Sequence, residues 1–294
     1  MRIVSLLPSA TEIVYALGLA DQLVGVSFEC DEPPAARRDH AVVVGGLDTG
    51  GLSPGQIDEQ VRARLAAGEQ LYTLHAGALA GLAPQLVIAQ DLCQVCALPA
   101  GEVTRALAHL GCQAQVLSLD PHTLQQVLES IQLVADRAAV PGRGDALVAT
   151  LRARLAAVAS AVQGRRRPRV AVLEWVDPPF TAGHWVPDLV RAAGGQPVGG
   201  QAGGRSVQAG WDEFAAGRPE LILVAPCGFH LSEAADQART VLGRLPDVPV
   251  WAIDADGLVV RPGPRLVAGV EAIASILHPD AVPPPGPGSI VRVA

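Results

Sequence analysis

Short apolar runs alternate with helical patterns along most of the chain. Runs of apolar residues, many of them β-branched, predict buried strands at residues 3–7, 24–26, 42–44, 86–89, 115–119, 170–175, 221–225 and 250–253. Apolar residues spaced by three or four positions predict helices at residues 11–17, 57–67, 103–110, 187–193, 234–245 and 265–277. Strands that alternate with helices are typical of parallel sheets covered by helices. The pattern therefore predicts an α/β protein.

The alternation stops in the middle of the chain. Residues 123–137 and 145–162 both have helical spacing, with a short break at Pro141-Gly142. The second segment would be about 27 Å long at a rise of 1.5 Å per residue. A helix of this length between two sheet-forming blocks predicts two Rossmann-like lobes with parallel sheets. We expect a single long backbone helix to join them and a ligand cleft to lie between them.

This reading divides the 294 residues into four segments. They are an N-terminal α/β lobe at 1–122, a helical linker with the backbone helix at 123–166, a C-terminal α/β lobe at 167–280 and a disordered tail at 281–294. The tail contains the run Pro-Pro-Pro-Gly-Pro-Gly, which is incompatible with regular structure. The remaining length suits two lobes better than one core.

Composition excludes several classes of protein. Hydrophobic residues make up 49% of the chain and charged residues 17%, which is enough apolar material for two cores and excludes a largely disordered chain. The net charge of −7 argues against nucleic acid as a partner. No apolar run approaches the length of about 20 residues that a membrane helix needs, so we expect no membrane insertion. We expect a monomer that is not an enzyme.

The opening residues and the cysteines bear on location. Met1 and Arg2 lead directly into an apolar run that Pro8 ends, and a secretory signal has a longer apolar region. Five cysteines, an odd number, suit a reducing compartment better than a disulfide framework. The sequence as read predicts a cytoplasmic protein. A periplasmic or extracellular location would follow if a leader had been removed.

Candidate ligand contacts lie after the predicted strands, because ligands bind beyond the carboxyl ends of parallel strands. These loops carry Pro8, Ser9, Phe28, Glu29, Cys30, Asp91, Cys93, Cys96, Phe180, His184, Trp185, Cys227, Phe229 and Arg261. Ser9 could also cap the helix that follows it, with Glu12 completing a capping box.

Four of the five cysteines lie in these loops, and Cys112, the fifth, is expected in the core. Cys93 and Cys96 have the C-x-x-C spacing that suits metal ligation or redox exchange. With Cys30 and Cys227 they could bind zinc or an iron–sulfur cluster, or approach a cobalt centre. The alternative is four reduced cysteines that line an apolar cleft.

Three further residues have a functional and a structural interpretation. His184 could supply a ring-nitrogen ligand and Trp185 an aromatic wall, but a loop histidine can equally be a surface hydrogen-bonding residue. Arg261 could reach amide or carboxylate oxygens of a ligand, or it could form a salt bridge.

Several stretches resemble a known family. Residues 2–12 (Arg-Ile-Val-Ser-Leu-Leu-Pro-Ser-Ala-Thr-Glu), 24–27 and 84–89 resemble the first lobe of helical-backbone, class III substrate-binding proteins, which serve ATP-driven importers of vitamin B12, iron-siderophores and heme. Residues 178–183 (Pro-Pro-Phe-Thr-Ala-Gly) and 261–265 resemble the second lobe of the vitamin B12 members. The cysteine-bearing stretches resemble a signal-less branch labelled cobalamin-binding.

The resemblance implies a ligand, a partner and some contacts. The ligand would be a corrinoid such as cobalamin, and an ABC permease would be the partner. Phe180, Arg261, the Pro8-Ser9 loop and the loop 28–30 would contact the corrinoid. The family places aromatic residues in the cleft of the first lobe, where this chain offers Gln90, Asp91 and cysteines.

Our leading hypothesis is therefore a non-catalytic binding protein for a corrinoid or a related metal chelate. The alternative is a cytosolic metal-binding or redox protein that uses Cys30, Cys93, Cys96 and Cys227 on the same scaffold. A third hypothesis, an enzyme that modifies a bound corrinoid, has no acid–base pair in the sequence to support it.

Overall fold

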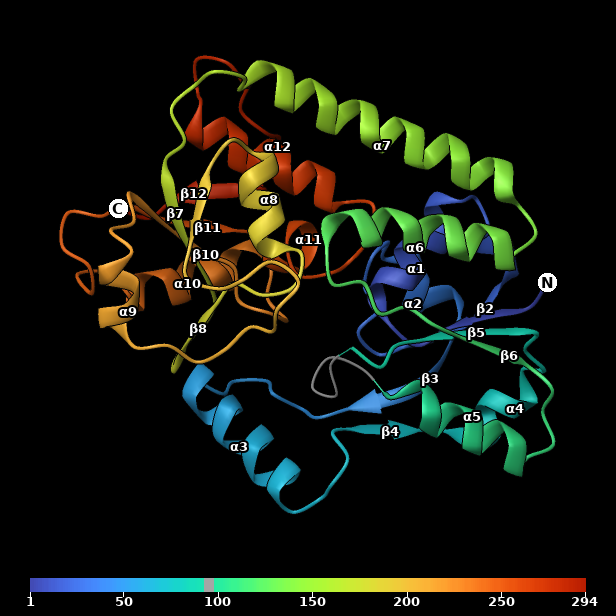
Figure 1. Ribbon diagram of the computed structural model, residues 1–294. Helices are drawn as coiled ribbons and strands as arrows, with labels where there is room; N and C mark the ends of the chain where they lie inside the picture. Colours follow the sequence, from blue (N-terminus) through green and yellow to red (C-terminus); the bar gives the residue numbers. More distant parts are fainter. Residues whose placement is uncertain (93–97) are drawn as a thin grey trace. The chain divides into compact units, whose positions relative to one another are not determined.

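The computed structural model describes residues 1–92 and 98–294 (Figure 1). The chain forms two compact units: unit 1 contains residues 1–121 and 128–148, and unit 2 contains residues 122–127 and 149–294. Two helices, α6 (Leu124–Arg137) and α7 (Pro141–Ala161), carry the chain from one unit to the other. With 21 residues, α7 is about 32 Å long, so the predicted long backbone helix is confirmed.

Unit 1 is built on a six-stranded sheet of order β4-β3-β2-β1-β5-β6. Its strands are β1 (Ile3–Ser5), β2 (Leu23–Ser27), β3 (Ala41–Gly46), β4 (Tyr72–Leu74), β5 (Leu86–Ala89) and β6 (Gln115–Ser118). Its other helices are α1 (Pro8–Ala16), α2 (Ala35–Asp39), α3 (Pro54–Ala66), α4 (Ala76–Gly81) and α5 (Ala100–His109), with a 3₁₀ turn at Ala20–Gln22. All neighbouring strands are parallel except β3 and β4, which are antiparallel.

The sheet of unit 1 is apolar on both faces, as a parallel sheet covered by helices requires. Val4 of β1 and Val87 of β5 pack with Leu79 of α4 and with Val103 and Leu107 of α5 in one buried cluster. The alternate strand residues, such as Ile3 and Ile88, are also fully buried. Side chains alternate across a strand, so two-sided burial explains why the runs read as continuously apolar.

Unit 2 has the sheet order β12-β11-β10-β7-β8, and β9 pairs with β7. Its strands are β7 (Arg169–Val176), β8 (Pro179–Thr181), β9 (Gln196–Val198), β10 (Leu221–Val224), β11 (Val250–Ile253) and β12 (Ile290–Arg292). Its other helices are α8 (Val186–Ala192), α9 (Trp211–Ala216), α10 (Leu231–Thr240), α11 (Ala255–Leu258) and α12 (Leu266–Leu277). Leu173, Ile222 and Ala252 pack with Phe214 of α9 and Ala238 of α10 to form its core.

The predicted fold class is confirmed, with two corrections. The sheets are mixed, because short antiparallel strands β4, β8 and β12 lie beside the parallel strands. The predicted disordered tail is wrong for Ile290–Arg292, which pairs with β11. Ile290 and Val291 are β-branched residues that suit a strand, and they follow the proline-rich run that ends the helical part of unit 2.

Candidate functional site

Unit 1 carries an aromatic pair where its parallel strands end. Phe28 directly follows β2, and Tyr72 lies opposite Gly46, the last residue of β3. The rings of Phe28 and Tyr72 are 6.2 Å apart, and both side chains are half-buried. A Cβ at Gly46 would lie 2.1 Å from the Phe28 ring, so only glycine allows this ring position. The predicted residue Phe28 is therefore joined at this edge by a second aromatic residue, Tyr72.

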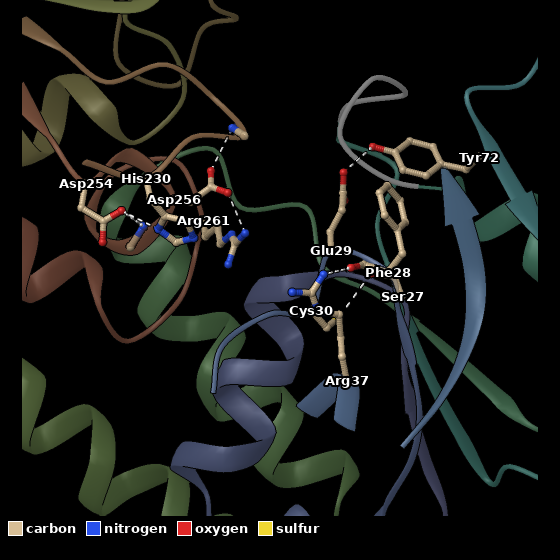
Figure 2. A network of polar contacts seen from close by, with 12 residues as sticks. Ser27, Phe28, Glu29, Cys30, Arg37, Tyr72, His230, Asp254, Asp256 and Arg261 are labelled. Carbon is tan, nitrogen blue, oxygen red and sulfur yellow. Dashed lines mark hydrogen bonds and ion pairs between the residues drawn. The ribbon is translucent and has the colours of Figure 1, made fainter. Parts of the chain in front are cut away.

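Polar contacts hold this loop in place (Figure 2). Arg37 Nη1 donates to the Phe28 carbonyl at 2.8 Å, and the Tyr72 hydroxyl donates to Glu29 Oε1 at 3.4 Å. The backbone N–H of Phe28 donates to the Val44 carbonyl at 3.0 Å. The predicted site residues Phe28 and Glu29 thus lie together at the end of the sheet.

Cys30 is an interior residue of unit 1, with 0% of its surface exposed. The Thr11 hydroxyl lies 3.1 Å from its Sγ and donates to Ser5 Oγ at 2.8 Å, and Ser27 Oγ lies 3.2 Å from the same sulfur. Burial raises the pKa of the Cys30 thiol, with the Ser27 and Thr11 hydrogen bonds acting in the opposite direction. A buried, protonated thiol is a poor metal ligand. Cys30 therefore lies in the predicted loop after β2, but its side chain is buried in unit 1 instead of facing a ligand.

The start of α1 also differs from the expectation. Pro8 is the first helical residue and Leu7 the N-cap, and no side chain caps the helix. Ser9 and Glu12 lie inside the helix and are buried. The predicted cap at Ser9 is wrong because proline favours the first helical position, which moves the start of the helix one residue upstream of Ser9.

Asp91 has a structural role after β5. Its Oδ1 accepts from the Ala100 N–H at the start of α5 at 2.8 Å, and its Oδ2 accepts from the Ser118 hydroxyl at 3.4 Å. Its own N–H donates to Asp120 Oδ1 at 2.5 Å. These bonds tie β5, β6 and α5 together. The predicted ligands Cys93 and Cys96 lie outside the described residues.

Unit 2 gathers three aromatic residues where its strands end. Trp175 lies near the end of β7, opposite Phe180 in the register with β8, and its ring centroid is 5.8 Å from that of Phe229 in the loop after β10. All three side chains are half-buried. The Trp175 indole N–H donates to the Asp177 carbonyl at 3.0 Å, which fixes the ring plane. Phe180 and Phe229 were predicted site residues, and Trp175 was missed.

A largely buried ion pair lies in the segment after β11, and its aspartate also bonds to the loop after β10. Arg261 Nη2 lies 2.6 Å from Asp256 Oδ2, and their side chains are 10% and 9% exposed. Asp256 Oδ1 also accepts from the Gly228 N–H at 2.9 Å, and the Asp256 N–H donates to the Phe229 carbonyl at 3.1 Å (Figure 2). Two interpretations of Arg261 were open, a ligand contact and a salt bridge. In unit 2 Arg261 forms the salt bridge.

A histidine–aspartate pair lies beside this ion pair. His230 Nδ1 is 2.8 Å from Asp254 Oδ1, and Asp254 caps α11 by accepting from the Gly257 N–H at 3.2 Å. His230 is the residue before α10. The pair thereby connects the starts of two helices that follow neighbouring parallel strands.

Of the predicted residues His184 and Trp185, only Trp185 lies in the interior of unit 2. Trp185 is 5% exposed, and its indole N–H donates to the Val259 carbonyl at 2.7 Å. His184 is half-buried, and its Nε2 is buried without a hydrogen-bond partner among the described residues. The interpretation of His184 as a surface hydrogen-bonding residue is therefore wrong.

The cysteines do not form a metal site in the described part of the chain. Cys227 is exposed after β10, whereas Cys30 is buried in unit 1. Among the described residues, no group of three or more potential metal ligands includes a cysteine. Cys112, expected in the core, is half-buried and packs against the core of unit 1.

Two cavities lie away from these residues. One of about 490 Å³ adjoins Pro84, Gln85 and Gln115, where β5 and β6 begin, and one of about 330 Å³ adjoins Pro249 and Val250, where β11 begins. Both are at amino ends of strands. Ligands of open α/β sheets bind at the carboxyl ends, and neither cavity contains a predicted ligand contact.

The family model described as "periplasmic binding protein" matches residues 3–252 of this chain. The chain belongs to the periplasmic binding protein family. The fold, two α/β units connected by a long helix, is that of the class III members. Among the described residues, no helix has both the length and the hydropathy that a membrane crossing requires.

The names of similar proteins include two kinds of ligand, vitamin B12 and heme. The chain is 25% identical over 279 residues to the vitamin B12-binding protein of Vibrio cholerae, covering 94% of this chain and 88% of that protein. The crystal structure of the periplasmic vitamin B12-binding protein of V. cholerae covers 94% of this chain and 96% of its own, with a TM-score of 0.68 and 25% identity. A periplasmic heme-binding protein from Roseiflexus has the same fold, with a TM-score of 0.70 at 23% identity, covering 95% and 98%.

The structure places some of the predicted ligand contacts at strand ends and others in the interior. Phe28, Glu29, Phe180 and Phe229 lie half-buried at strand ends. Cys30 and Trp185 are interior residues. The residues that sequence reasoning missed are Tyr72, Trp175, Asp254 and Asp256, together with the histidine of the pair, His230. The rarity of tyrosine, of which the chain has two, was a usable signal for Tyr72.

Proposed function

We propose that this protein is a substrate-binding protein that holds a corrinoid. The supporting observation is the distribution of aromatic side chains. The chain has four Trp, two Tyr and four Phe residues, and five of these lie half-buried at the carboxyl ends of the two sheets. They are Phe28 and Tyr72 in unit 1, and Trp175, Phe180 and Phe229 in unit 2.

Aromatic faces with few free charges suit a large, flat and mostly neutral ligand. Ligand sites are lined mainly by apolar and aromatic groups, with a few polar groups that fix orientation. The carboxylate of Asp256 is engaged by Arg261 and Gly228, and that of Asp254 by His230. These pairs position the loops, and the rings remain as the main contact surface. A corrin macrocycle with amide side chains fits this chemistry, and the vitamin B12-binding relative supports it.

Heme is the competing ligand, because a heme-binding protein has the same fold. The two ligands differ in charge at their edges: the amides of cobalamin are neutral, whereas the propionates of heme are anionic and require unpaired cations. Arg261, the cation among the predicted ligand contacts, is already paired with Asp256. This pairing favours the neutral ligand.

Calorimetry with cyanocobalamin and, separately, with hemin would test the proposal. We expect tight binding of cyanocobalamin and weaker binding of hemin. Trp175→Leu and Phe229→Leu each remove a ring and keep apolar volume, and we expect about tenfold weaker cobalamin binding from the loss of about 1.4 kcal/mol of ring contact.

Trp251→Leu is the matched control, because Trp251 is the second residue of β11 and lies toward the amino end of its strand, whereas Trp175 lies near the carboxyl end of β7. Its affinity for cobalamin should equal that of the unaltered protein. Equal losses in all three variants would mean that the rings after the strands have no special role in binding.

The proposal implies an ABC permease as the partner. It also implies an exported location, because a substrate-binding protein delivers its ligand to the permease from outside the cytoplasm. Co-purification with a permease, and cell fractionation of the native protein, would measure both. A chain retained in the cytoplasm that still binds cobalamin would limit the proposal to corrinoid binding without uptake.

A further inference from the structure

The segment that enters α6 is attached to unit 2 at two points. The ring of His122 is 5.7 Å from the ring of His184, and the Leu124 N–H donates to Asp188 Oδ2 of α8 at 3.3 Å. Residues 122–127 belong to unit 2, whereas α6 from residue 128 onward belongs to unit 1. These contacts therefore decide how firmly the first turn of the connecting helix is held.

The backbone at His184 has an unusual conformation. Its φ is +48°, in the left-handed region that non-glycine residues seldom adopt. Its N–H donates to the Gly204 carbonyl at 2.5 Å, and its carbonyl accepts from the Gly203 N–H at 2.9 Å. Gly183 has no room for a Cβ, which would lie 2.2 Å from the Ser206 backbone nitrogen. The loop thus imposes the ring position of His184, and residues in such conformations cluster at functional sites.

The surroundings of the His184 ring favour its neutral form. Its centroid is 5.7 Å from that of Trp185 and 5.7 Å from that of His122. Its Nε2 is buried without a partner among the described residues. Burial lowers the pKa of His184, and His122 and Arg205 lower it further. The nearby carboxylate, Asp188, is engaged by Leu124 and by Arg191 at 3.1 Å.

We propose that His184, whose ring lies against that of His122, is a proton-sensitive latch that holds the start of α6 on unit 2 while the His184 imidazole is neutral and releases it when that imidazole is protonated. A proton on His184 would enter a site that contains His122 and Arg205 and has no unengaged carboxylate among the groups described above. Like charges at this separation disfavour the closed contact. The latch is a conformational device, independent of which ligand the protein binds.

The direction of the pH effect follows from the lowered pKa of His184. When the latch is open, the ring titrates near its ordinary pKa of about 6.5. When the latch is closed, the ring takes up a proton only at lower pH. The closed state is therefore fully favoured above about pH 6.5, and it loses stability as the pH falls below that value. Each unit of pKa difference between the two states corresponds to about a tenfold change in the equilibrium.

Amide hydrogen exchange followed by mass spectrometry would test the latch. Peptides that cover residues 122–127 would be compared at pH 7.5 and 5.0, with rates corrected for intrinsic exchange and α12 (Leu266–Leu277) as the internal reference. We expect the protection of 122–127 to fall about tenfold more than that of α12. His184→Asn keeps a residue that tolerates the left-handed conformation and cannot titrate, so the extra loss should vanish.

Two further variants keep the test decisive. His122→Gln removes the ring that lies against His184 and should reduce the extra loss even if His184→Asn does not fold. His109→Gln changes an exposed histidine at the end of α5 and should leave the loss as it is. Equal pH dependence of 122–127 and α12 in the unaltered protein, or an unchanged extra loss in both latch variants, would overturn the proposal.

Discussion

The two sheets present similar aromatic residues at their carboxyl ends but fix the loops around them by different means. In unit 1 the charged side chains of Arg37 and Glu29 bond to neutral partners, the Phe28 carbonyl and the Tyr72 hydroxyl. The hydroxyls of Thr11 and Ser27 each bond to the Cys30 thiol, and Gly46 leaves room for the Phe28 ring. In unit 2 the second layer is ionic: Asp256 pairs with Arg261 and also accepts from the Gly228 N–H in the loop after β10. One edge therefore depends on packing volume, and the other on charge.

This difference predicts which substitutions lower the free energy of unfolding most in each unit. Removing one partner of a largely buried ion pair leaves the other charge uncompensated, which costs more than the pair itself contributes. A change of volume at a close contact between a ring and the backbone costs a moderate amount. Loss of a weak thiol hydrogen bond costs least.

Asp256→Ala should cause the largest loss. It leaves Arg261 without its buried carboxylate and the Gly228 N–H without its acceptor. We expect the free energy of unfolding to fall by about 3 kcal/mol, measured by urea denaturation. The exposed pair of Asp236 with Arg239 provides the control, and Asp236→Ala should change stability by about 0.5 kcal/mol or less. Equal effects of the two variants would refute an ionic second layer in unit 2.

Gly46→Ala should cost less and act on unit 1. Its Cβ would meet the Phe28 ring, so the ring must move, at a cost of about 2 kcal/mol. Gly77 in α4 has no neighbour within 4 Å of such a Cβ, and Gly77→Ala should be neutral or stabilising, because alanine favours helices. Thermal unfolding of both variants measures the difference, and a neutral Gly46→Ala would contradict the packing that we describe.

Cys30→Ala should have the smallest effect on stability, about 1 kcal/mol from lost packing and weak hydrogen bonds. The sharper readout is thiol labelling of the folded protein at pH 7.5. Burial and the raised pKa keep Cys30 unreactive, so Cys30→Ala should leave the number of labelled thiols unchanged. Cys227 is exposed, and Cys227→Ala should lower that number by one. Loss of a labelled thiol in Cys30→Ala would show that Cys30 is accessible.

The fold could be predicted largely from the sequence, because buried parallel strands are continuous apolar runs. Residues 86–89 and 250–253 were predicted with the bounds that β5 and β11 have. The short strands β4, β8, β9 and β12 were missed. Each has three residues at the side of a sheet, too few for a period-2 pattern to show.

The candidate site was predictable only at the level of loops. The rule that ligands lie beyond strand ends found Phe28, Phe180 and Phe229. It could not find Tyr72, because that residue reaches the same end of the sheet by starting an antiparallel strand. It placed Cys30 in a loop, since no sequence signal shows that Ser27 and Thr11 enclose the thiol. Burial within a loop depends on contacts between distant residues, which spacing does not record.

The most direct test of corrinoid binding is an absorption spectrum. The purified protein would be incubated with excess cyanocobalamin, passed through a desalting column and scanned from 300 to 600 nm in parallel with the Trp175→Leu variant. The account predicts that the unaltered protein retains the corrinoid bands at about one equivalent per chain and that the variant retains less. A desalted protein without corrinoid bands, in a sample that retains heme after the same treatment, would contradict it.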